Sequence, residues 1–220
     1  MPAKPATPKK ESRPARTKAA RTVVPGDQAQ AHLLEAAMEL FQREGIHAVG
    51  VDAVVKRAGV NKMCLYRQFA SKDELILAYL KRQDEACLAR LDQSIACRPG
   101  EPRRQLEQIF IDLAQRASSP DYRGCPFINV AAEFPERDHP ARKLVAANKA
   151  ALVARLTALV EALPVADPTS LVNTLALLLE GAYAASQTFG AGNSPLAILP
   201  TVAAQLIDAA IASSAPAVAG

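Results

Sequence analysis

The sequence predicts an all-α protein, and three observations support this prediction. Of the 220 residues, 50% are hydrophobic, which is enough for the packed core of one large domain or two small ones. Ala and Leu dominate that apolar set, whereas the aromatic residues that favour strands make up only 5% and Trp is absent. Apolar residues also recur at helical spacing, with no strand-like alternation of comparable length.

The first 25 residues differ from the rest of the chain. They hold seven Lys or Arg side chains against one Glu, many Pro and Ala residues, and no apolar run. Such a segment buries too little surface to fold, so residues 1–25 are expected to form a disordered basic tail. The tail either solubilises the chain or contacts a polyanion without sequence preference.

Neither a signal peptide nor a membrane span is indicated. The tail lacks the apolar stretch of a signal peptide, and the longest apolar segments are interrupted by polar side chains such as Asn173, Glu180 and Gln187. None reaches the roughly 20 clean apolar residues that a span requires. We therefore expect a cytoplasmic protein with no membrane partner.

The segment 27–45 predicts the first helix, with Asp27 as its N-cap and Gly45 at its end. Its apolar face would be formed by Leu33, Ala37, Leu40 and Phe41. A short helix ending at Gly59 follows, and another begins within two residues of that glycine. These two helices are expected to meet across a tight turn.

A fourth helix is predicted from about 72 to about 95. Ser71 stands three residues before Glu74, the spacing of a capping box, in which each side chain satisfies a backbone donor. The break at "CRPGEP" then ends this helix, whose length suits a connector between an N-terminal module over 26–80 and a second module over 81–213. The second module is predicted to contain helices at about 103–117, 126–134, 140–163, 168–189 and 195–213, followed by a tail over 214–220.

The two short helices and their turn, at about 49–68, form a helix-turn-helix pattern. This pattern places its second helix in the DNA major groove, and Gly59 permits the positive φ that the turn needs. Its expected core is Val54, Val55, Ala58, Val60, Leu65 and Phe69. The opposite face would expose a set of side chains able to donate to phosphates and to read base edges: Asn61, Lys62, Met63, Tyr66, Arg67 and Gln68.

A basic cluster accompanies this motif. Its members have no carboxylate among them along the chain, as expected for a partner that is a phosphate backbone: Lys56, Arg57, Lys62, Arg67 and Lys72. Asp73 and Glu74 come directly afterwards, in the first turn of the next helix, where capping and the helix dipole stabilise acids.

The run from Leu33 to Leu80 closely resembles the N-terminal domain of the tetracycline-repressor (TetR) family of bacterial transcriptional regulators. The resemblance lies in "A-x-E-L-F-x-x-x-G", "A-G-V-x-x-x-x-L-Y-x-x-F" and "S-K-x-E-L", all in register. It covers less than a third of the chain. It implies an N-terminal three-helix DNA-binding domain followed by a variable helical domain that binds a ligand and dimerises.

The resemblance also implies roles for individual residues. Tyr66 would place its hydroxyl on a phosphate, and Lys72 would clamp another. Lys62 and Arg67 would contact phosphates or base edges, with Asn61 and Met63 at the leading end of the recognition helix. The candidate DNA contacts are Gly50, Asn61, Lys62, Met63, Cys64, Tyr66, Arg67 and Lys72.

Two departures from the family pattern keep its DNA preference from being transferred. Val49 and Gly50 stand where the family usually has Thr and then Ser, which removes a hydroxyl cap and a phosphate contact. Met63 and Cys64 replace the usual Gly and then Thr or Ser of the recognition helix.

The resemblance further implies a homodimer that reads a palindromic operator. The last two helices would pair across the dimer axis, because "EGAYAAS" offers small residues for close approach; the alternative is that they are intramolecular core. A small, largely apolar effector would bind in the second module and alter DNA binding. Pocket candidates by residue type are Phe110, Leu113, Phe127, Asn129, Glu133 and Tyr183.

The four cysteines, at 64, 87, 97 and 125, are scattered and indicate neither a disulfide framework nor a zinc site. Cys125, beside Arg123 and before Pro126, is a candidate reactive thiol for oxidants or electrophiles, with a plain structural thiol as the alternative. His139 lies near two acids, but "ERDHPARK" is more typical of a helix start than of a metal site. No metal or cofactor is expected.

The sequence thus predicts a regulator that binds double-stranded DNA, responds to a ligand and acts as a repressor, which is the family's commonest mode. One alternative is a non-specific nucleic-acid-binding protein driven by the basic tail. The other is an enzyme that uses an apolar helical pocket, although no catalytic triad, phosphate loop or metal cluster supports one. We therefore expect no enzyme activity.

Overall fold

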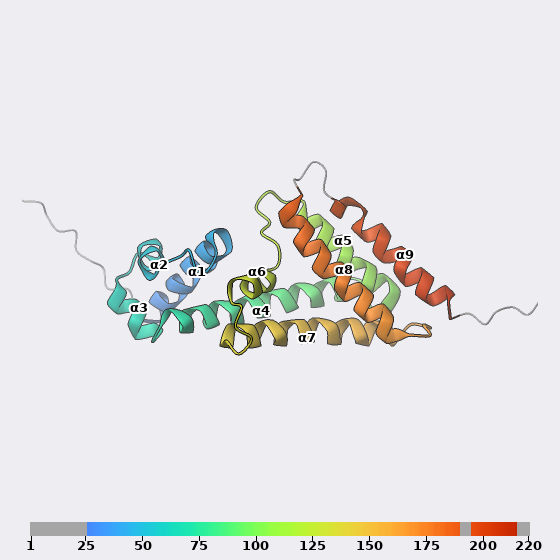
Figure 1. Ribbon diagram of the computed structural model, residues 1–220, viewed down its shortest axis with the longest axis horizontal. Helices are drawn as coiled ribbons and strands as arrows, with labels where there is room; N and C mark the ends of the chain where they lie inside the picture. Colours follow the sequence, from blue (N-terminus) through green and yellow to red (C-terminus); the bar gives the residue numbers. More distant parts are fainter. Residues whose placement is uncertain (1–25, 190–194, 215–220) are drawn as a thin grey trace, which may run out of the picture.

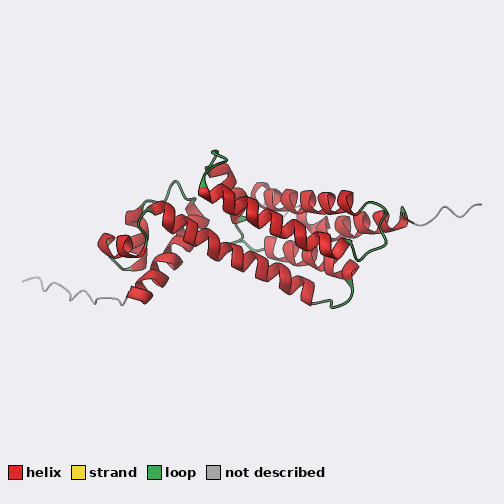
Figure 2. Ribbon diagram, turned by 90° about the horizontal axis from the view of Figure 1, so that it is seen from below, coloured by secondary structure: helices red, strands yellow, loops and turns green. Residues whose placement is uncertain are grey.

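The computed structural model describes residues 26–189 and 195–214, and every regular element in these ranges is a helix (Figures 1 and 2). This confirms the all-α fold. The elements are α1 (Gly26–Glu44), α2 (Val51–Ala58), α3 (Lys62–Gln68), α4 (Lys72–Ala96), α5 (Pro102–Ala117), α6 (Pro126–Glu133), α7 (Pro140–Val160), α8 (Pro168–Thr188), the 3₁₀ turn η1 (Pro195–Ile198) and α9 (Leu199–Ala212). The basic tail predicted over 1–25 lies outside the described residues.

The helices α1, α2 and α3 share one apolar core with the start of α4, with α6 and with the start of α7. The predicted apolar face of α1 is buried in it: Leu33, Ala37, Leu40 and Phe41. Phe41 meets Tyr79 of α4 edge to face, with ring centroids 5.4 Å apart, which fixes α1 against α4. The N-cap prediction for Asp27 was wrong, because α1 already begins at Gly26.

The turn between α2 and α3 has the predicted geometry. Gly59 ends α2 at φ 71°, a left-handed conformation that costs glycine nothing sterically. Gly50 precedes α2 without a side-chain cap, as its lack of a hydroxyl requires. Val54, Val55, Leu65 and Phe69 are buried, while Ala58 and Val60 pack against the same core. The tight turn therefore presents α3 on one end of the molecule (Figure 1).

The long helix α4 extends from the end that carries α3 into the second half of the protein, with α7 packed along it (Figure 1). Ser71 Oγ accepts the N–H of Glu74 at 3.1 Å, and the Glu74 carboxylate accepts the N–H of Ala70, so the helix start is capped from both sides. Its 25 residues span roughly 37 Å. One continuous helix therefore belongs to both halves.

The remaining helices form a second core between α4, α5, α7, α8 and α9. Helix α7 stops three residues before the predicted end at 163, because Pro164 disfavours helical geometry in the residue that precedes it. The helix predicted over 195–213 is divided: η1 precedes α9, which begins where Pro200 occupies a first-turn position. Among the described residues, Pro195–Ala212 is the one segment whose length and apolar composition would suffice to cross a membrane.

Candidate functional site

The recognition helix α3 presents an exposed face to solvent at the end of the molecule opposite α9 (Figure 1). Leu65 is fully buried and anchors α3 on α1 and α2. The exposed face carries Met63, 67% exposed, and Tyr66, 51% exposed, with Lys62 and Arg67 beside them. This face therefore combines two large exposed side chains with two cations, a composition that suits contact with DNA phosphates and base edges.

Asn61 occupies the N-cap of α3. Its Oδ1 accepts the N–H of Cys64 at 2.8 Å, which satisfies one of the donors that a helix start leaves unpaired. The Asn61 side chain, which was predicted to lie at the leading end of the recognition helix, therefore caps α3 in this structure. Cys64 is half-buried beneath this cap, and Gly50 is exposed at the start of α2.

The basic cluster has carboxylate partners that the sequence order does not reveal. Lys62 Nζ lies 2.8 Å from Asp52 Oδ1 across the α2–α3 turn, and Arg57 pairs with Glu39 of α1 at 2.5 Å. The hydrogen bond to Asp52 raises the pKa of Lys62. The expectation that the cluster lacks carboxylates is thus wrong for the folded protein. Helix packing places Asp52 and Glu39, which lie earlier in the chain, beside Lys62 and Arg57. Both pairs are exposed to solvent, so each contributes little to stability.

Arg67 and Lys72 differ in how they are held. Arg67 forms no ion pair within the described part of the chain, and its guanidinium rests against Met63 Sδ at 3.8 Å. Lys72 Nζ donates to the backbone carbonyl of Ile46 at 2.7 Å. An ammonium group has three donors, so this bond orients Lys72 and leaves donors for a phosphate.

A junction on α6 connects the two halves of the protein. The Glu133 carboxylate accepts the backbone N–H groups of Ile46 at 3.0 Å and His47 at 2.7 Å, and a ring nitrogen of His47 lies 2.8 Å from the Glu133 carbonyl. The Phe134 ring contacts the rings of both His47 and His139. His139 caps α7 through Nδ1, which confirms the helix-start interpretation.

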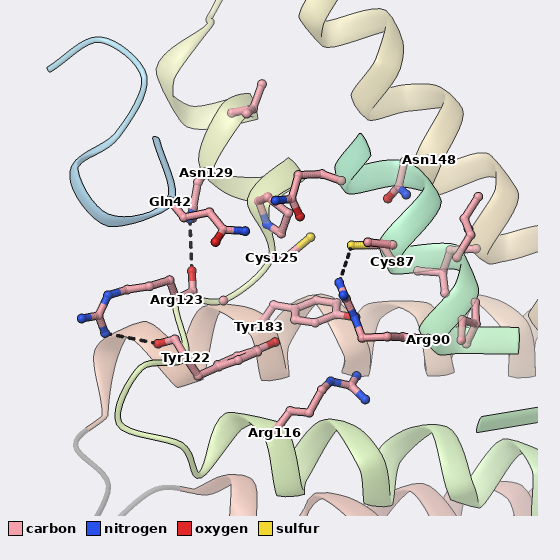
Figure 3. Close-up of a pocket in the computed structure, with 18 of the residues that line it drawn as sticks. Gln42, Cys87, Arg90, Arg116, Tyr122, Arg123, Cys125, Asn129, Asn148 and Tyr183 are labelled. Carbon is pink, nitrogen blue, oxygen red and sulfur yellow. Dashed lines mark hydrogen bonds between the residues drawn. The ribbon is translucent and has the colours of Figure 1, made fainter. Parts of the chain in front are cut away.

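A cavity of about 390 Å³ lies between α1, α4, α5, α6, α7 and α8 (Figure 3). Four of the six predicted pocket residues line it: Leu113, Asn129, Glu133 and Tyr183. Phe110 and Phe127 do not line it; each is packed in one of the two cores instead. Residue type alone did not separate core aromatics from cavity aromatics.

Sequence reasoning missed the polar wall of this cavity. Gln83, Cys87, Arg90 and Ser94 follow one another along α4 at helical spacing and all line the cavity, together with Arg116 and Tyr122 from the α5 side. A polar stripe on the face of α4 that turns inward was the available signal. Burial raises the pKa of Tyr122 to about 12, and it also raises the pKa of Tyr79 and of Tyr183.

Cys125 is buried at the first turn of α6 and lines the same cavity. The cation expected beside it, Arg123, is turned away and donates to the carbonyls of Pro120 and Tyr122 (Figure 3). Lys149 takes that place, with Nζ 3.6 Å from Cys125 Sγ while it also pairs with Glu180. The pairing with Arg123 was therefore wrong, because the turn at Gly124 directs the two side chains apart. No group of His, Cys, Asp and Glu suited to a metal occurs in the described ranges.

Comparison with known proteins agrees with this geometry. Residues 33–79 match the model of the bacterial regulatory proteins of the tetR family, and residues 100–197 match that of the tetracyclin repressor-like C-terminal domain. The transcriptional activator FasR of Mycolicibacterium smegmatis is 40% identical over 85 residues. That match spans 39% of this chain and 39% of FasR.

Two solved structures cover more of the chain. A TetR-family transcriptional regulator from Streptomyces coelicolor is 29% identical, with a TM-score of 0.76 over 86% of this chain and 97% of its own. A protein from Streptomyces avermitilis described as a TetR transcriptional regulator is 32% identical, with a TM-score of 0.73 over 83% and 97%. With the exposed recognition helix and both family matches, these relatives show that the chain belongs to the TetR family of DNA-binding transcriptional regulators.

Proposed function

We propose that this regulator is a ligand-responsive repressor that acts as a homodimer on a palindromic operator. The observation that supports operator binding is the exposed face of α3, where Tyr66, Arg67 and Lys62 surround Met63. Lys62, Arg67 and Tyr66 are donors that reach phosphates or base edges, and Met63 offers an apolar contact for a thymine methyl. Gly50, Asn61, Cys64 and Lys72 complete the proposed contact set.

The homodimer is supported by the surface of α8 and α9. A shallow groove between them is lined almost wholly by apolar groups, among them Leu177, Gly181 and Ile198. Leu177 is 73% exposed and Ile198 60%, and a Cβ added to Gly181 would meet nothing within 4 Å. An exposed apolar face with room for close approach suits the matching face of a second copy. A two-fold dimer would place two α3 helices on two half-sites.

The ligand response is supported by the position of α6. One end of this helix carries Cys125 and Asn129 on the cavity wall, and the other carries Glu133, which holds the Ile46–His47 turn of the DNA-binding half. A ligand that prefers one placement of α6 would shift the same turn. Such coupling is reciprocal, so DNA would alter ligand affinity by the same factor.

Selection from a random duplex library, comparing wild type with Tyr66→Phe, tests operator binding. We expect a palindromic consensus whose affinity falls for the variant, since the hydroxyl that reaches a phosphate is removed. Anisotropy across salt then gives the number of phosphates neutralised. An absence of enrichment for wild type would contradict the proposal.

Transcription in vitro from a promoter that carries the selected operator tests the sign of regulation. A repressor lowers the transcript yield, whereas a rise would make this chain an activator, as FasR is described.

Analytical ultracentrifugation tests the dimer: wild type is expected as a dimer at micromolar concentration, and Leu177→Glu as a monomer. Ala147→Glu, on the exposed surface of α7, is the matched control.

We include in this proposal a DNA-binding module over 26–80 and an effector and dimerisation module over 81–213. It also includes a cytoplasmic location and the absence of enzyme activity.

That the Cys125 thiol reacts with oxidants or electrophiles stays a hypothesis. If Cys125→Ser leaves the release of DNA by oxidants or electrophiles unchanged, the thiol has only a structural role.

A further inference from the structure

The polar wall of the cavity holds cations that no carboxylate neutralises. Arg116 of α5 forms no hydrogen bond or ion pair through its side chain within the described residues. Arg90 of α4 is exposed at the cavity wall, and its one side-chain hydrogen bond among the described residues goes to Cys87 Sγ, at 3.1 Å. Both line the same cavity as Tyr122, and the three side chains lie together in the close-up (Figure 3). An unpaired guanidinium in a concave site is a strong recognition element for a carboxylate.

Gln83 is the second, independent observation. Its side chain lines the cavity and is 3% exposed, and its Nε2 has no hydrogen-bond partner among the described residues. A buried amide without a partner is costly, and native proteins seldom keep one unless something outside the chain completes it. Gln83 precedes Arg90 by two helical turns, so both donors project from the same face of α4. The cavity wall therefore offers hydrogen-bond donors that have no acceptor among the described residues.

The acids near the cavity do not reverse its charge. The Glu133 carboxylate is occupied by the backbone N–H groups of Ile46 and His47, and Glu180 is paired with Lys149. Asp121 also lines the cavity, exposed in the loop after α5, but the guanidinium groups of Arg90 and Arg116 outnumber it there. The remaining lining supplies an apolar region, with Leu91, Ile109, Leu113 and Leu179 from three helices.

We propose that the cavity binds an organic acid: an apolar body among the leucines and a carboxylate that accepts from Arg116, Arg90 and Gln83. This inference rests on the proposed ligand response and adds the chemical class of the ligand. A neutral ligand of equal size would leave the guanidinium of Arg116 desolvated without a counter-charge. An organic cation would be repelled. Anion charge is therefore the property that the site selects.

Isothermal titration with the full chain tests this, using decanoate and its uncharged isostere decanamide, and phenylbutyrate with its primary amide. Each acid is expected to bind about ten- to a hundredfold tighter than its amide, the value of a charge-assisted hydrogen bond. Arg116→Gln should remove this preference and leave amide binding unchanged. Arg104→Gln, on the outer surface of the same helix, keeps the preference and controls for net charge.

The outcomes separate this inference from the proposed function. Equal binding of acid and amide, or no binding of either acid, overturns the anion site, while operator binding and dimerisation are judged by their own experiments. A preference for acids that Arg116→Gln leaves intact also overturns it. Acid binding that depends on Arg116 but does not change operator affinity supports the anion site and contradicts the ligand response. Unchanged far-UV circular dichroism of each variant shows that folding is retained.

Discussion

Glu133 and His47 hold each other from both sides: the Glu133 carboxylate accepts the backbone N–H of His47 at 2.7 Å, and the His47 ring lies 2.8 Å from the Glu133 carbonyl. They are 86 residues apart in the chain and belong to different halves of the protein. Two bonds between the same residues resist rotation as well as separation. The junction therefore ties the end of α6 to the turn before α2 at more than one point.

Replacing Glu133 with Gln should loosen this junction. The amide retains one acceptor oxygen but points an N–H group at a backbone N–H, so one charge-assisted hydrogen bond is lost at a cost of about 1–2 kcal/mol in the free energy of unfolding. Operator affinity should change, and its response to ligand should weaken. Chemical denaturation and anisotropy measure both. Glu136→Gln, an exposed acid on the next loop, should behave like wild type.

Replacing Asn61 with Ala should destabilise the recognition helix by about 1 kcal/mol, because the N–H of Cys64 loses its acceptor. Asn61→Ser keeps a capping oxygen and should restore the free energy of unfolding measured by denaturation. If Ser also restores operator affinity, Asn61 acts by fixing α3. If Ser is stable but changes the selected consensus, Asn61 reads a base.

Replacing Asp52 with Asn should strengthen DNA binding. The variant releases Lys62 from its ion pair and removes a negative charge near the backbone, with less than about 0.5 kcal/mol change in stability, because the pair is exposed. If Lys62 then neutralises a phosphate, the slope of log affinity against log salt becomes steeper by about 0.9. Glu85→Gln, the same charge change on α4, should leave that slope unaltered. An equal slope for both variants would place Lys62 away from DNA.

Replacing Gln83 with Met should stabilise the ligand-free protein. The side chains are similar in size, and removal of an unpartnered buried amide is expected to raise the free energy of unfolding by about 1 kcal/mol. The same change should weaken decanoate binding severalfold, since a donor is lost. Thermal melts with and without decanoate measure the two effects. A variant that is less stable than wild type would mean that the amide has a structural partner.

Cys87 should alkylate slowly at neutral pH. Burial raises the pKa of its thiol, so the thiolate that reacts is scarcer than for an ordinary cysteine. Mass spectrometry after timed iodoacetamide treatment should find Cys97, which is exposed, modified first. The rate at Cys87 should rise as the pH increases above 9, and a bound acid should protect it further.

The sequence predicted the helices well because their signals are local. The capping residue Ser71, the glycine turn at Gly59 and the apolar face of α1 each act within a few residues, and all three were found as predicted. The same local reasoning misplaced the start of α1, which begins at Gly26, one residue before the expected N-cap Asp27.

Site details that depend on distant segments were not predictable in the same way. Asp52 meets Lys62, Glu39 meets Arg57, and Lys149 reaches Cys125 only because helices pack. No spacing in the chain encodes which buried aromatic faces a cavity, so Phe110 and Tyr183 looked alike as candidates. Charge pairing and cavity shape emerge with tertiary structure.

The continuity of α4 has a consequence for building hybrid regulators. Lys72 at its start faces the DNA-binding half, and Gln83 and Arg90 further along face the cavity, all on one uninterrupted helix. Successive residues in a helix are turned by about 100°. A hybrid joined inside α4 with one residue too many or too few would therefore turn the cavity wall by that angle relative to α3. Exchanging the halves of two relatives requires their α4 helices to be aligned without gaps.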